Sequence, residues 1–412
     1  MLQRIKNIYH LGNGILGNLR FGFPSHKLTV IGVTGTDGKT TTTSLIYHVL
    51  STSGRNASMI SSVGAVIGGR EYDVGFHVTT PSSWALQKFI KEAEKGFLVL
   101  ETTSHALDQF RVWGIKFDIG VLTNITHEHL DYHKTYHKYV EAKAKLLEMS
   151  RVAIVNRDDK SYPLINSKFA RLAAKREIRN SKLITYGMKD NADLNPKKFP
   201  FKTNMIGEFN IYNSLAAIAV CRALGIPDED IRTGLKSFKP PIGREEVVYK
   251  KDFTVMIDFA HTPNAFEEIL SSIKPSIKGR LIHVFGSAGL RDNTKRPIMG
   301  RVSSKYADII VLTSEDPRSE SVEKISDEIE SGIKIPNSKS QITNKSKIQI
   351  YKIPNRQEAI QFAIKIARKG DLVLTTGKSH EKSMNYGHGE VPWDEYSAVR
   401  KALKGLGLKI KD

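Results

Sequence analysis

A strand, a glycine-rich turn and a helix follow one another near the start of the chain, and this order constrains the fold most. The apolar run 28–33 predicts a buried strand, and apolar residues recur at helical spacing over 40–50. The turn between them ends in Lys39 and is followed by Thr40. Such a turn directs backbone N–H groups at an anion, the helix dipole adds positive potential, and a lysine adds a full charge. The stretch therefore predicts a phosphate site, with the Thr40 hydroxyl placed for Mg²⁺.

The glycines of this turn do not fit the usual phosphate-loop motif literally. The motif places its first glycine five positions before the last one, where this chain has Val33. Gly32 and Gly35 lie on either side of that position. Because the strand, the lysine, the threonine and the helix all fall in the expected order, we interpret the stretch as a nucleotide-binding loop rather than a chance glycine-rich turn.

The composition is that of a globular protein and bounds its partners. Of 412 residues, 40% are hydrophobic and 25% are charged, and this length suggests about two or three domains. The formal net charge of +19 favours anionic partners, but no basic–aromatic interleaving or zinc-finger spacing indicates nucleic acid, and we expect none as a partner. The single cysteine, Cys221, lies in an apolar helical run, so we expect no disulfide and a reducing cytoplasm.

The first 22 residues combine apolar side chains with Gly12, Gly14 and Gly17. They lack the continuous apolar core and the small-residue cleavage site of a signal peptide, and no apolar run in the chain is long enough to span a membrane. We expect a helix that packs on the neighbouring domain. The alternative is an amphipathic helix that contacts a membrane surface.

Short apolar strands alternate with helical patterns through the first part of the chain. Strands are predicted at 28–33, 57–66, 76–80, 97–101, 119–124 and 152–155, with helices at about 40–50, 83–95 and 136–150. Gly68-Gly69 indicates a hairpin. Residues 157–200 are lysine-rich and have a weaker pattern, before a strong helix at 213–224.

A second alternation of strands and helices runs from 255 to 376, after a predicted linker at 240–243. Such alternation is typical of α/β folds with a mostly parallel sheet between helices. We therefore predict a helical stub at 1–26, a central phosphate-loop domain at 27–241 and a C-terminal Rossmann-like α/β domain at 242–412.

Polar side chains follow several of the predicted strands. Glu101 and Asn124 end two of them, and His129 comes shortly after Asn124. Ligands collect at the carboxyl ends of parallel strands, and a carboxylate with an imidazole beside a triphosphate suits Mg²⁺ or Mn²⁺. Taken alone, the histidine-rich segment also allows a zinc site, although no cysteine accompanies it. Lys143 and Lys145 lie on the next predicted helix, and the residues alone predict two exposed lysines.

Three polar turns follow strands in the second alternation, at 286–292, 316–318 and 377–381. Their placement at one edge predicts a cleft between the domains, where arginines suit a substrate carboxylate held by two hydrogen bonds. Asp258, which follows an earlier strand, suits a ribose hydroxyl but equally suits a cap on the next helix.

Taken in order, these motifs resemble the Mur ligase family, the ATP-dependent amino-acid ligases of peptidoglycan synthesis, and within it the muramyl-tripeptide synthetases. The resemblance runs from about residue 27 to the C-terminus. It rests on residues 35–41, 79–81, 101–107, 123–131, 207–210, 213, 243–244, 258–263 and 295–297. It implies a cytoplasmic, ADP-forming acid–amino-acid ligase that serves cell-wall biogenesis, cell shape and cell division.

The resemblance also assigns roles to individual residues. Lys39 and Thr40 would bind ATP and its Mg²⁺ or Mn²⁺, while Glu101, His129 and a carbamylated Lys143 would bind a second metal; Lys145 competes for the carbamate. The rest of the nucleotide site would comprise Gly35, Thr36, Asp37, Gly38, Thr41, Asn210, Asn213, Arg244 and Asp258. The acceptor site would comprise Thr79, Thr80, Thr103, Gln109 and Arg111. The amino-acid site would comprise Arg291, Asp316, Arg318, Gly377 and Glu381.

The implied reaction joins a diamino acid to a muramyl dipeptide through an acyl phosphate. Lys39 and the metals would neutralise charge on the transferred phosphoryl group. Arg318 would pair with the distal carboxylate of the amino acid and Glu381 with its distal ammonium, which favours meso-diaminopimelate over lysine. We expect a monomer whose partners are these small molecules.

The chain departs from the family pattern in three places. Glu315-Asp316 replaces the usual Asp-Asn, and this added negative charge favours a more cationic amino acid. The turn 288–291 replaces the usual Gly-Gly-Asp-Arg. About 26 residues precede the first strand, too few for the family's N-terminal UDP-binding domain. Either the uridine half is bound minimally, the substrate is not a UDP-sugar, or another subunit supplies that domain.

Two other functions compete with this hypothesis. The first is a related ligase acting on another γ-glutamyl, lipid-linked or cell-wall acceptor, of the folylpolyglutamate type. The second is a non-catalytic nucleotide-binding relative, against which the intact Lys39, Glu101, His129 and Lys143 argue.

Overall fold

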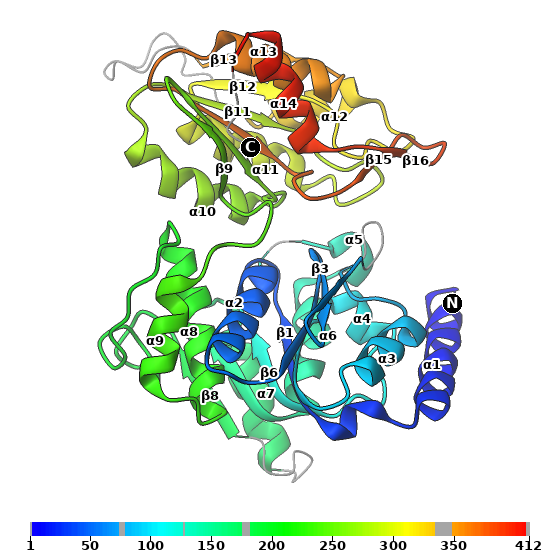
Figure 1. Ribbon diagram of the computed structural model, residues 1–412. Helices are drawn as coiled ribbons and strands as arrows, with labels where there is room; N and C mark the ends of the chain where they lie inside the picture. The colour runs from blue at the N-terminus through cyan, green and yellow to red at the C-terminus, as the bar shows by residue number, and fades with distance from the viewer. Residues whose placement is uncertain (1, 74–78, 127, 175–181, 334–347, 409–412) are drawn as a thin grey trace. The chain divides into compact units, whose positions relative to one another are not determined.

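The computed structural model describes residues 2–73, 79–126, 128–174, 182–333 and 348–408 (Figure 1). The chain divides into an N-terminal unit, Met1–Thr126 with Tyr132–Pro241, and a C-terminal unit, His127–Asp131 with Ile242–Asp412. The division after Pro241 falls in the segment 240–243. The grouping of the short segment before Tyr132 with the C-terminal unit has no counterpart in the sequence pattern.

An eight-stranded sheet forms the centre of the N-terminal unit, in the order β4-β3-β2-β5-β1-β6-β7-β8. Its strands are β1 (Leu28–Thr34), β2 (Ala57–Ser61), β3 (Gly64–Ile67), β4 (Arg70–Tyr72), β5 (Gly96–Glu101), β6 (Phe117–Leu122), β7 (Ser150–Asn156) and β8 (Lys182–Tyr186). β3 pairs antiparallel with β2 and β4, and the other neighbours are parallel. The predicted mostly parallel sheet is confirmed.

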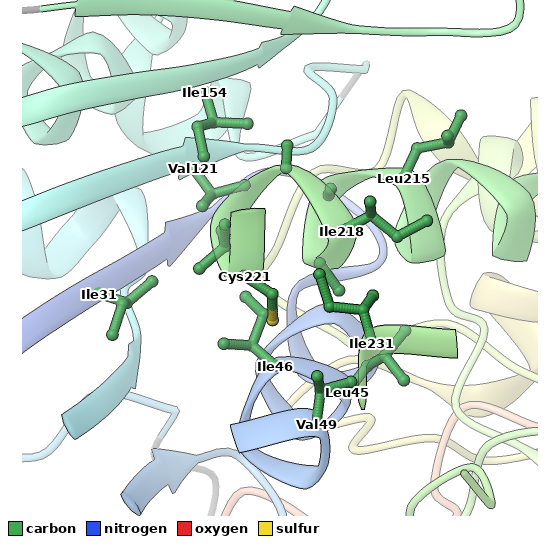
Figure 2. Close-up of a cluster of buried hydrophobic side chains, with 14 of the residues drawn as sticks. Ile31, Leu45, Ile46, Val49, Val121, Ile154, Leu215, Ile218, Cys221 and Ile231 are labelled. Atoms are coloured by element: carbon green, nitrogen blue, oxygen red, sulfur yellow. The ribbon is translucent and has the colours of Figure 1, made fainter. Parts of the chain in front are cut away.

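Helices cover both faces of this sheet, as the nearly continuous apolar strands require. One face carries α2 (Lys39–Thr52), α8 (Glu208–Ala223) and α9 (Asp228–Ser237). The other carries α3 (Ser83–Glu92), α4 (Ser104–Asp108), α6 (Tyr136–Glu148) and α7 (Tyr162–Ala174). Figure 2 shows the first of these cores, with Cys221 of α8 among Ile46 of α2 and Val121 of β6. Burial raises the pKa of the Cys221 thiol to about 12, which fits the predicted packing role.

The predicted strand 57–66 is instead two antiparallel strands, β2 and β3, joined by a tight turn. The turn forms at Ser62, because its backbone N–H donates to Oε2 of Glu101 (3.0 Å) and is lost to the sheet ladder. The hairpin predicted at Gly68-Gly69 is confirmed between β3 and β4. Most of the predicted strand 76–80 lies outside the described residues.

The N-terminal segment is a helix, α1 (Leu2–Phe21), followed by a short 3₁₀ turn, η1 (Pro24–Lys27). α1 lies beside α3 in Figure 1, as expected of a helix that packs on the domain. Within the described residues, no helix combines the length and the apolar character needed to cross a bilayer.

A six-stranded sheet forms the centre of the C-terminal unit, in the order β13-β12-β11-β14-β10-β9. Its strands are β9 (Glu246–Lys250), β10 (Thr254–Asp258), β11 (Leu281–Phe285), β12 (Ile309–Leu312), β13 (Gln349–Lys352) and β14 (Leu372–Thr376). Only the β9–β10 pair of this sheet is antiparallel. A hairpin of β15 (Ser383–Asn385) and β16 (Glu390–Pro392) follows.

Helices again lie on both faces of this second sheet. One face packs against α10 (Pro263–Ile273), α11 (Lys295–Tyr306) and α12 (Val322–Glu330), and the other against α13 (Arg356–Ile366) and α14 (Glu395–Gly405). Two short elements complete the described structure, α5 (Leu130–His133) and η2 (Lys274–Ser276). The predicted second α/β unit is confirmed.

A buried histidine gives this unit an expected pH dependence. His283 of β11 contacts the hydroxyls of Ser303 (2.9 Å) and Thr376 (3.1 Å), and burial lowers its pKa from 6.5 to about 3. Between these two pKa values the unfolded chain binds a proton that the folded chain does not. The free energy of unfolding is therefore undiminished by His283 above pH 6.5 and decreases as the pH falls below it. The loss should reach about 2 kcal/mol near pH 5.

Denaturant unfolding at several pH values measures this loss. The variant His283→Gln should show a flatter slope between neutral pH and about pH 5. The matched variant His137→Gln, whose side chain is 66% exposed, should keep the wild-type slope. Equal slopes in the wild type and His283→Gln would contradict the assignment.

Candidate active site

The phosphate loop joins the carboxyl end of β1 to the N-terminus of α2. Lys39 is the first residue of α2, and its Nζ donates to the Thr36 carbonyl oxygen (2.7 Å). Gly38 has a φ of 79°, and a Cβ at this position would lie 2.3 Å from Oδ1 of Asn213. The N-cap residue of α2 is Gly38, which has no side chain to cap the helix. The loop therefore presents a helix N-terminus and a lysine to an anion.

The segment after β6 holds this loop in place. Asn124 accepts the backbone N–H of Thr36 with its carbonyl oxygen and that of Asp37 with Oδ1, both at 2.9 Å. The Thr123 hydroxyl donates to the Asp37 carbonyl oxygen (2.7 Å). A Cβ at Gly35 would lie 1.8 Å from the same hydroxyl, so only glycine fits there. The expected meeting of the loop and Asn124 at one sheet edge is confirmed.

Glu101 ends β5, and the parallel register places it beside Val33 of β1. Its two carboxylate oxygens accept from the Thr40 hydroxyl (3.1 and 3.0 Å), and Oε2 also accepts from the Ser62 N–H (3.0 Å). The Thr40 and Ser62 hydroxyl oxygens lie 2.9 Å apart. The carboxylate is buried, and both of these donors, the Thr40 hydroxyl and the Ser62 N–H, are neutral. A buried carboxylate with two neighbouring hydroxyls is a set of hard oxygen ligands that fits Mg²⁺.

The structure separates the two candidate lysines of α6. Lys143 is 2% exposed, donates from Nζ to the Gly35 carbonyl oxygen (2.5 Å) and lies 4.6 Å from the centroid of the Tyr139 ring. Lys145 is partly exposed and pairs with Asp108 (2.9 Å). The expectation from residues alone that both are exposed is wrong for Lys143, because the inward face of α6 packs against the phosphate loop.

Two asparagines of α8 lie beside the first turn of α2. Asn213 accepts from the Thr42 hydroxyl (3.2 Å) and donates from Nδ2 to Oδ1 of Asn210 (3.0 Å). Asn210 in turn donates to the Ile206 carbonyl oxygen (2.7 Å). Both amides are buried, and Thr41 is buried in the same turn of α2. The structure thus brings the expected nucleotide residues of the N-terminal unit together.

Next to Glu101 lies a hydrogen-bonded cluster of expected acceptor residues. The Thr80 hydroxyl donates to the Glu101 carbonyl oxygen and accepts from the Thr103 N–H, both at 3.1 Å. Arg111 donates to the Thr80 carbonyl oxygen (3.2 Å) and to Oε1 of Gln109 (3.0 and 2.7 Å). Burial lowers the pKa of Arg111, and no described carboxylate forms an ion pair with it. The cluster can therefore take up a substrate carboxylate.

In the C-terminal unit, Arg244 directly follows the linker and Asp258 ends β10. The Arg244 guanidinium lies 4.5 Å from the centroid of the Phe259 ring. Asp258 accepts two backbone N–H groups, at 2.8 and 2.7 Å, and burial raises its pKa. Thr262 caps α10 through its hydroxyl, so the alternative that Asp258 caps this helix is wrong.

His129, the expected imidazole ligand, belongs to the segment grouped with the C-terminal unit and has a left-handed φ of 56°. Its neighbour Glu128 is buried, with Oε1 3.3 Å from Nε2 of His261 and 3.8 Å from Nζ of Lys295. Burial alone would raise the pKa of Glu128. The charges of His129, His261 and Lys295 nevertheless hold this pKa well below its usual range. Glu128 therefore anchors the segment that carries His129.

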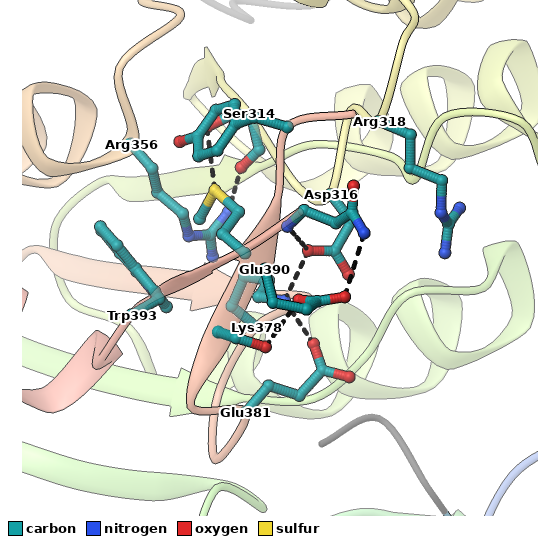
Figure 3. Close-up of polar contacts among 12 residues, drawn as sticks. Ser314, Asp316, Arg318, Arg356, Lys378, Glu381, Glu390 and Trp393 are labelled. Carbon is teal, nitrogen blue, oxygen red and sulfur yellow. Dashed lines mark hydrogen bonds and ion pairs between the residues drawn. The ribbon is translucent and has the colours of Figure 1, made fainter. Parts of the chain in front are cut away.

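The acidic residues expected at the amino-acid site share one buried lysine (Figure 3). Lys378 donates from Nζ to Oδ1 of Asp316 (2.9 Å) and to Oε2 of Glu381 (2.6 Å). Gly377 precedes it with a φ of 100°, and a Cβ there would lie 2.2 Å from Oε2 of Glu315. The carboxylate added by Asp316 is therefore paired with a cation rather than presented alone.

Two arginines lie near this acidic cluster. Arg318, with a φ of 53°, donates to the carbonyl oxygen of Gly289. Burial and the nearby charge of Arg291 lower the pKa of Arg318, while Asp316 opposes the shift. The turn that carries Arg291 is held by the buried Arg296, which donates to the Ala288 carbonyl oxygen (3.1 Å). The expected basic and acidic residues thus lie in the turns after β11, β12 and β14.

Sequence reasoning missed three contributors to these sites. Ser62 is one, and no signal in a predicted strand distinguished it. Lys378 is another, although two acidic residues without an assigned counter-charge indicated the need for a cation. Glu128 is the third. Thr79 is half-buried next to Thr80. Among the described residues, no three His, Cys, Asp or Glu side chains are arranged to hold a metal ion.

These features define a class, a nucleotide-binding enzyme with two α/β units. The profile of the Mur ligase middle domain matches residues 33–221, and that of the Mur ligase glutamate ligase domain matches residues 243–379. The UDP-N-acetylmuramoyl-L-alanyl-D-glutamate–2,6-diaminopimelate ligase 1 of Clostridium acetobutylicum is 36% identical over 416 residues, which cover 95% of this chain and 81% of the relative. The chain therefore belongs to the Mur ligase family, as its motifs predict.

Two further comparisons agree with this family. The diaminopimelate ligase of the same name from Aquifex aeolicus is 39% identical over 414 residues, 95% of this chain and 81% of the relative. A solved structure of a UDP-N-acetylmuramoyl-L-alanyl-D-glutamate–2,6-diaminopimelate ligase has a TM-score of 0.59 and 28% identity, covering 93% of this chain and 79% of the other.

Proposed function

We propose that this chain is an ATP-dependent, ADP-forming ligase that joins a diamino acid to a muramyl dipeptide-type acceptor in peptidoglycan precursor synthesis. The observation that carries the proposal is the contact of Glu101 with Thr40 beside a phosphate loop that also holds Lys143. The identity to named diaminopimelate ligases over 95% of the chain supports meso-diaminopimelate over lysine. We further propose that the enzyme is a cytoplasmic monomer.

The nucleotide would lie on the phosphate loop, with Lys39 and the start of α2 against its phosphates. Asn210 and Asn213 would contact the nucleotide, and the family resemblance gives the same role to Arg244 and Asp258. Thr40 and Glu101 would hold a divalent cation, which neutralises charge on the transferred phosphoryl group when it is bound.

Lys143 would act as its carbamate. The neutral amine nitrogen attacks the carbon of CO₂, a proton leaves, and a cation becomes an anion. The carbamate nitrogen retains one N–H, which can still donate to the Gly35 carbonyl oxygen, now 2.5 Å away. This group and Glu101 would hold a second metal ion, and the family resemblance also assigns His129 to that ion.

The acceptor would be oriented by the cluster around Thr80 and Arg111. Its carboxylate oxygen attacks the γ-phosphorus, which breaks the bond to ADP and forms an acyl phosphate. The amine of the diamino acid then attacks the acyl carbon, and the tetrahedral intermediate releases phosphate. Arg318 and Arg291 would hold the distal carboxylate of the amino acid, while Glu381 would hold its distal ammonium.

A matrix of substrates tests the proposal through phosphate release. Release that requires UDP-muramyl dipeptide together with meso-diaminopimelate is the expected result. Release with a folate and glutamate would favour a folylpolyglutamate-type ligase. Absence of release with every pairing would favour a non-catalytic relative, and either of these outcomes would overturn the proposal.

Removal of the Arg111 guanidinium should weaken acceptor binding. A charge-assisted hydrogen bond contributes about 1.5–3 kcal/mol, so Arg111→Gln should raise the acceptor KM about tenfold to a hundredfold and change kcat less. Initial rates at varied acceptor concentration measure this. Arg151→Gln is the control, because Arg151 is 72% exposed in the same unit. An unchanged acceptor KM in Arg111→Gln would remove Arg111 from the acceptor site.

Asp316 should influence the choice between diamino acids. Asp316→Asn removes one negative charge beside Lys378, which disfavours lysine, a net cation, more than zwitterionic diaminopimelate. The ratio of kcat/KM for lysine over diaminopimelate should fall at least about tenfold. Asp327→Asn, an exposed carboxylate of the same unit, should leave the ratio unchanged. A constant ratio in Asp316→Asn would contradict the assignment.

A further inference from the structure

α1 packs on the N-terminal unit through its polar and glycine side. Asn18 is fully buried and donates to the carbonyl oxygens of Trp113 (2.6 Å) and Gly14 (2.9 Å). A Cβ at Gly14 would lie 3.3 Å from Cβ of Trp113, and one at Gly17 would lie 3.5 Å from Cγ of Gln87. The helix therefore uses its small and polar residues for the contact that holds it.

Four large apolar side chains of α1 lie on the opposite side and are exposed. The exposed fractions are 69% for Ile8, 69% for Tyr9, 58% for Leu16 and 62% for Leu19. At 3.6 residues per turn, these four positions fall in one sector of the helix. A contiguous apolar surface of this kind marks an interaction site, because it is costly to leave in water.

Basic and aromatic side chains lie around Phe21, at the C-terminal end of α1. Arg20 of α1 and Lys91 of α3 each lie 5.9 Å from the centroid of the Phe21 ring. The ring of Trp84, a residue of α3 that is 48% exposed, lies 5.5 Å from the same centroid. Lys6 is also exposed, and α1 contains no acidic residue. On α3, Glu92 is paired with Lys88 at 4.0 Å. We define the α1 face as the stripe Ile8, Tyr9, Leu16 and Leu19 with the basic residues Lys6 and Arg20 of the same helix, together with the exposed Trp84 and Lys91 of the neighbouring α3.

We propose that the α1 face binds an anionic phospholipid surface. Apolar side chains enter the boundary between headgroups and acyl chains, while tyrosine and tryptophan prefer the level of the headgroups. The lysines and the arginine of this face attract anionic headgroups. A second copy of this chain is a poorer occupant, since each copy has these basic residues and a formal net charge of +19. The proposal assigns one side of α1 to the contact with the domain and the other side to the membrane surface.

Sedimentation of the full chain with lipid vesicles tests the proposal. We expect binding to mixed phosphatidylcholine–phosphatidylglycerol vesicles, much weaker binding to pure phosphatidylcholine, and loss of binding at high salt. Leu16→Glu with Leu19→Glu should weaken binding at least about tenfold. Leu164→Glu, at an exposed leucine of α7, is the matched control and should bind like the wild type. Tryptophan fluorescence should shift to the blue on binding, and Trp84→Phe should remove most of the shift.

Three results would overturn the proposal. The first is absence of wild-type binding to the anionic vesicles. The second is equal binding by the double variant and by Leu164→Glu. The third is a wild-type dimer, seen by analytical ultracentrifugation without vesicle binding and dissociated by the double variant, which would make a second copy the occupant. Both leucines are exposed, so their substitution should leave the core intact and the variant folded. Circular dichroism of each variant checks this.

Discussion

Lys143→Met should lower the rate of phosphate release by about a hundredfold to a thousandfold, the cost of removing one preorganised electrostatic group. The side chain is buried with its Nζ on the Gly35 carbonyl oxygen, so a carbamate there would place negative oxygens beside the phosphate loop. Methionine keeps the length and packing of the lysine but cannot form a carbamate. Steady-state phosphate release with ATP, acceptor and diamino acid measures the effect.

Lys145→Met is the matched control, two positions along the same helix. It loses only a partly exposed ion pair with Asp108, and its rate should stay within about threefold of the wild type. Removal of dissolved CO₂ should slow the wild type, and bicarbonate should restore it. Isotopically labelled bicarbonate should label the wild type and Lys145→Met but not Lys143→Met. Full activity in Lys143→Met, or indifference to CO₂, would exclude the carbamate.

Glu101→Gln should lower kcat by about a hundredfold to a thousandfold and weaken the apparent affinity for Mg²⁺ at least tenfold. The substitution removes the charge and keeps the shape. The amide oxygen can still accept the Ser62 N–H, so the turn after β2 should remain intact. Titration of activity with Mg²⁺, at saturating substrates, separates metal binding from the other steps.

Asp118→Asn is the control for this carboxylate. Asp118 lies near the amino end of β6, whereas Glu101 lies at the carboxyl end of β5 in the same sheet. Oδ2 of Asp118 accepts the Val30 N–H (3.1 Å). Its amide variant should keep the wild-type dependence on Mg²⁺. If Glu101→Gln also kept that dependence, the cation would have to bind elsewhere.

The phosphate loop could be predicted from the sequence because its signals are local. Lys39 and Thr40 follow a glycine turn at fixed spacing, and the strand before them is continuously apolar. Glu101 could be placed at the same sheet edge because parallel strands end together. By contrast, Lys143 and Lys145 are equivalent by composition, and only the packing of α6 against the loop distinguishes them.

Elements with weak local patterns were missed. The segment 157–200 contains α7 and β8, and the short strands β9 and β13 lie at the edges of their sheet. Both strands are short, with five and four residues, so neither gives a long apolar run or a long alternation. The turn at Ser62 also could not be predicted, because it depends on a carboxylate far along the chain.

α1 shows how periodicity can indicate an apolar face without identifying its neighbour. The apolar residues predicted an amphipathic helix, and a helix is present. Its closest approach to the unit, however, is made by Asn18, Gly14 and Gly17, since close approach to Trp113 requires small residues. Hydrophobic periodicity reports that a face is apolar, and only the tertiary structure reports what that face contacts.

The fate of one oxygen atom tests the proposed mechanism most directly. If the acceptor carboxylate attacks the γ-phosphorus, an acceptor labelled with heavy oxygen in that carboxylate must transfer one labelled atom to the released phosphate. Mass spectrometry of the phosphate, after turnover with ATP and the diamino acid, measures the transfer. The proposed mechanism predicts one heavy oxygen in each phosphate released, whereas unlabelled phosphate, or label in AMP, would contradict an acyl-phosphate ligase.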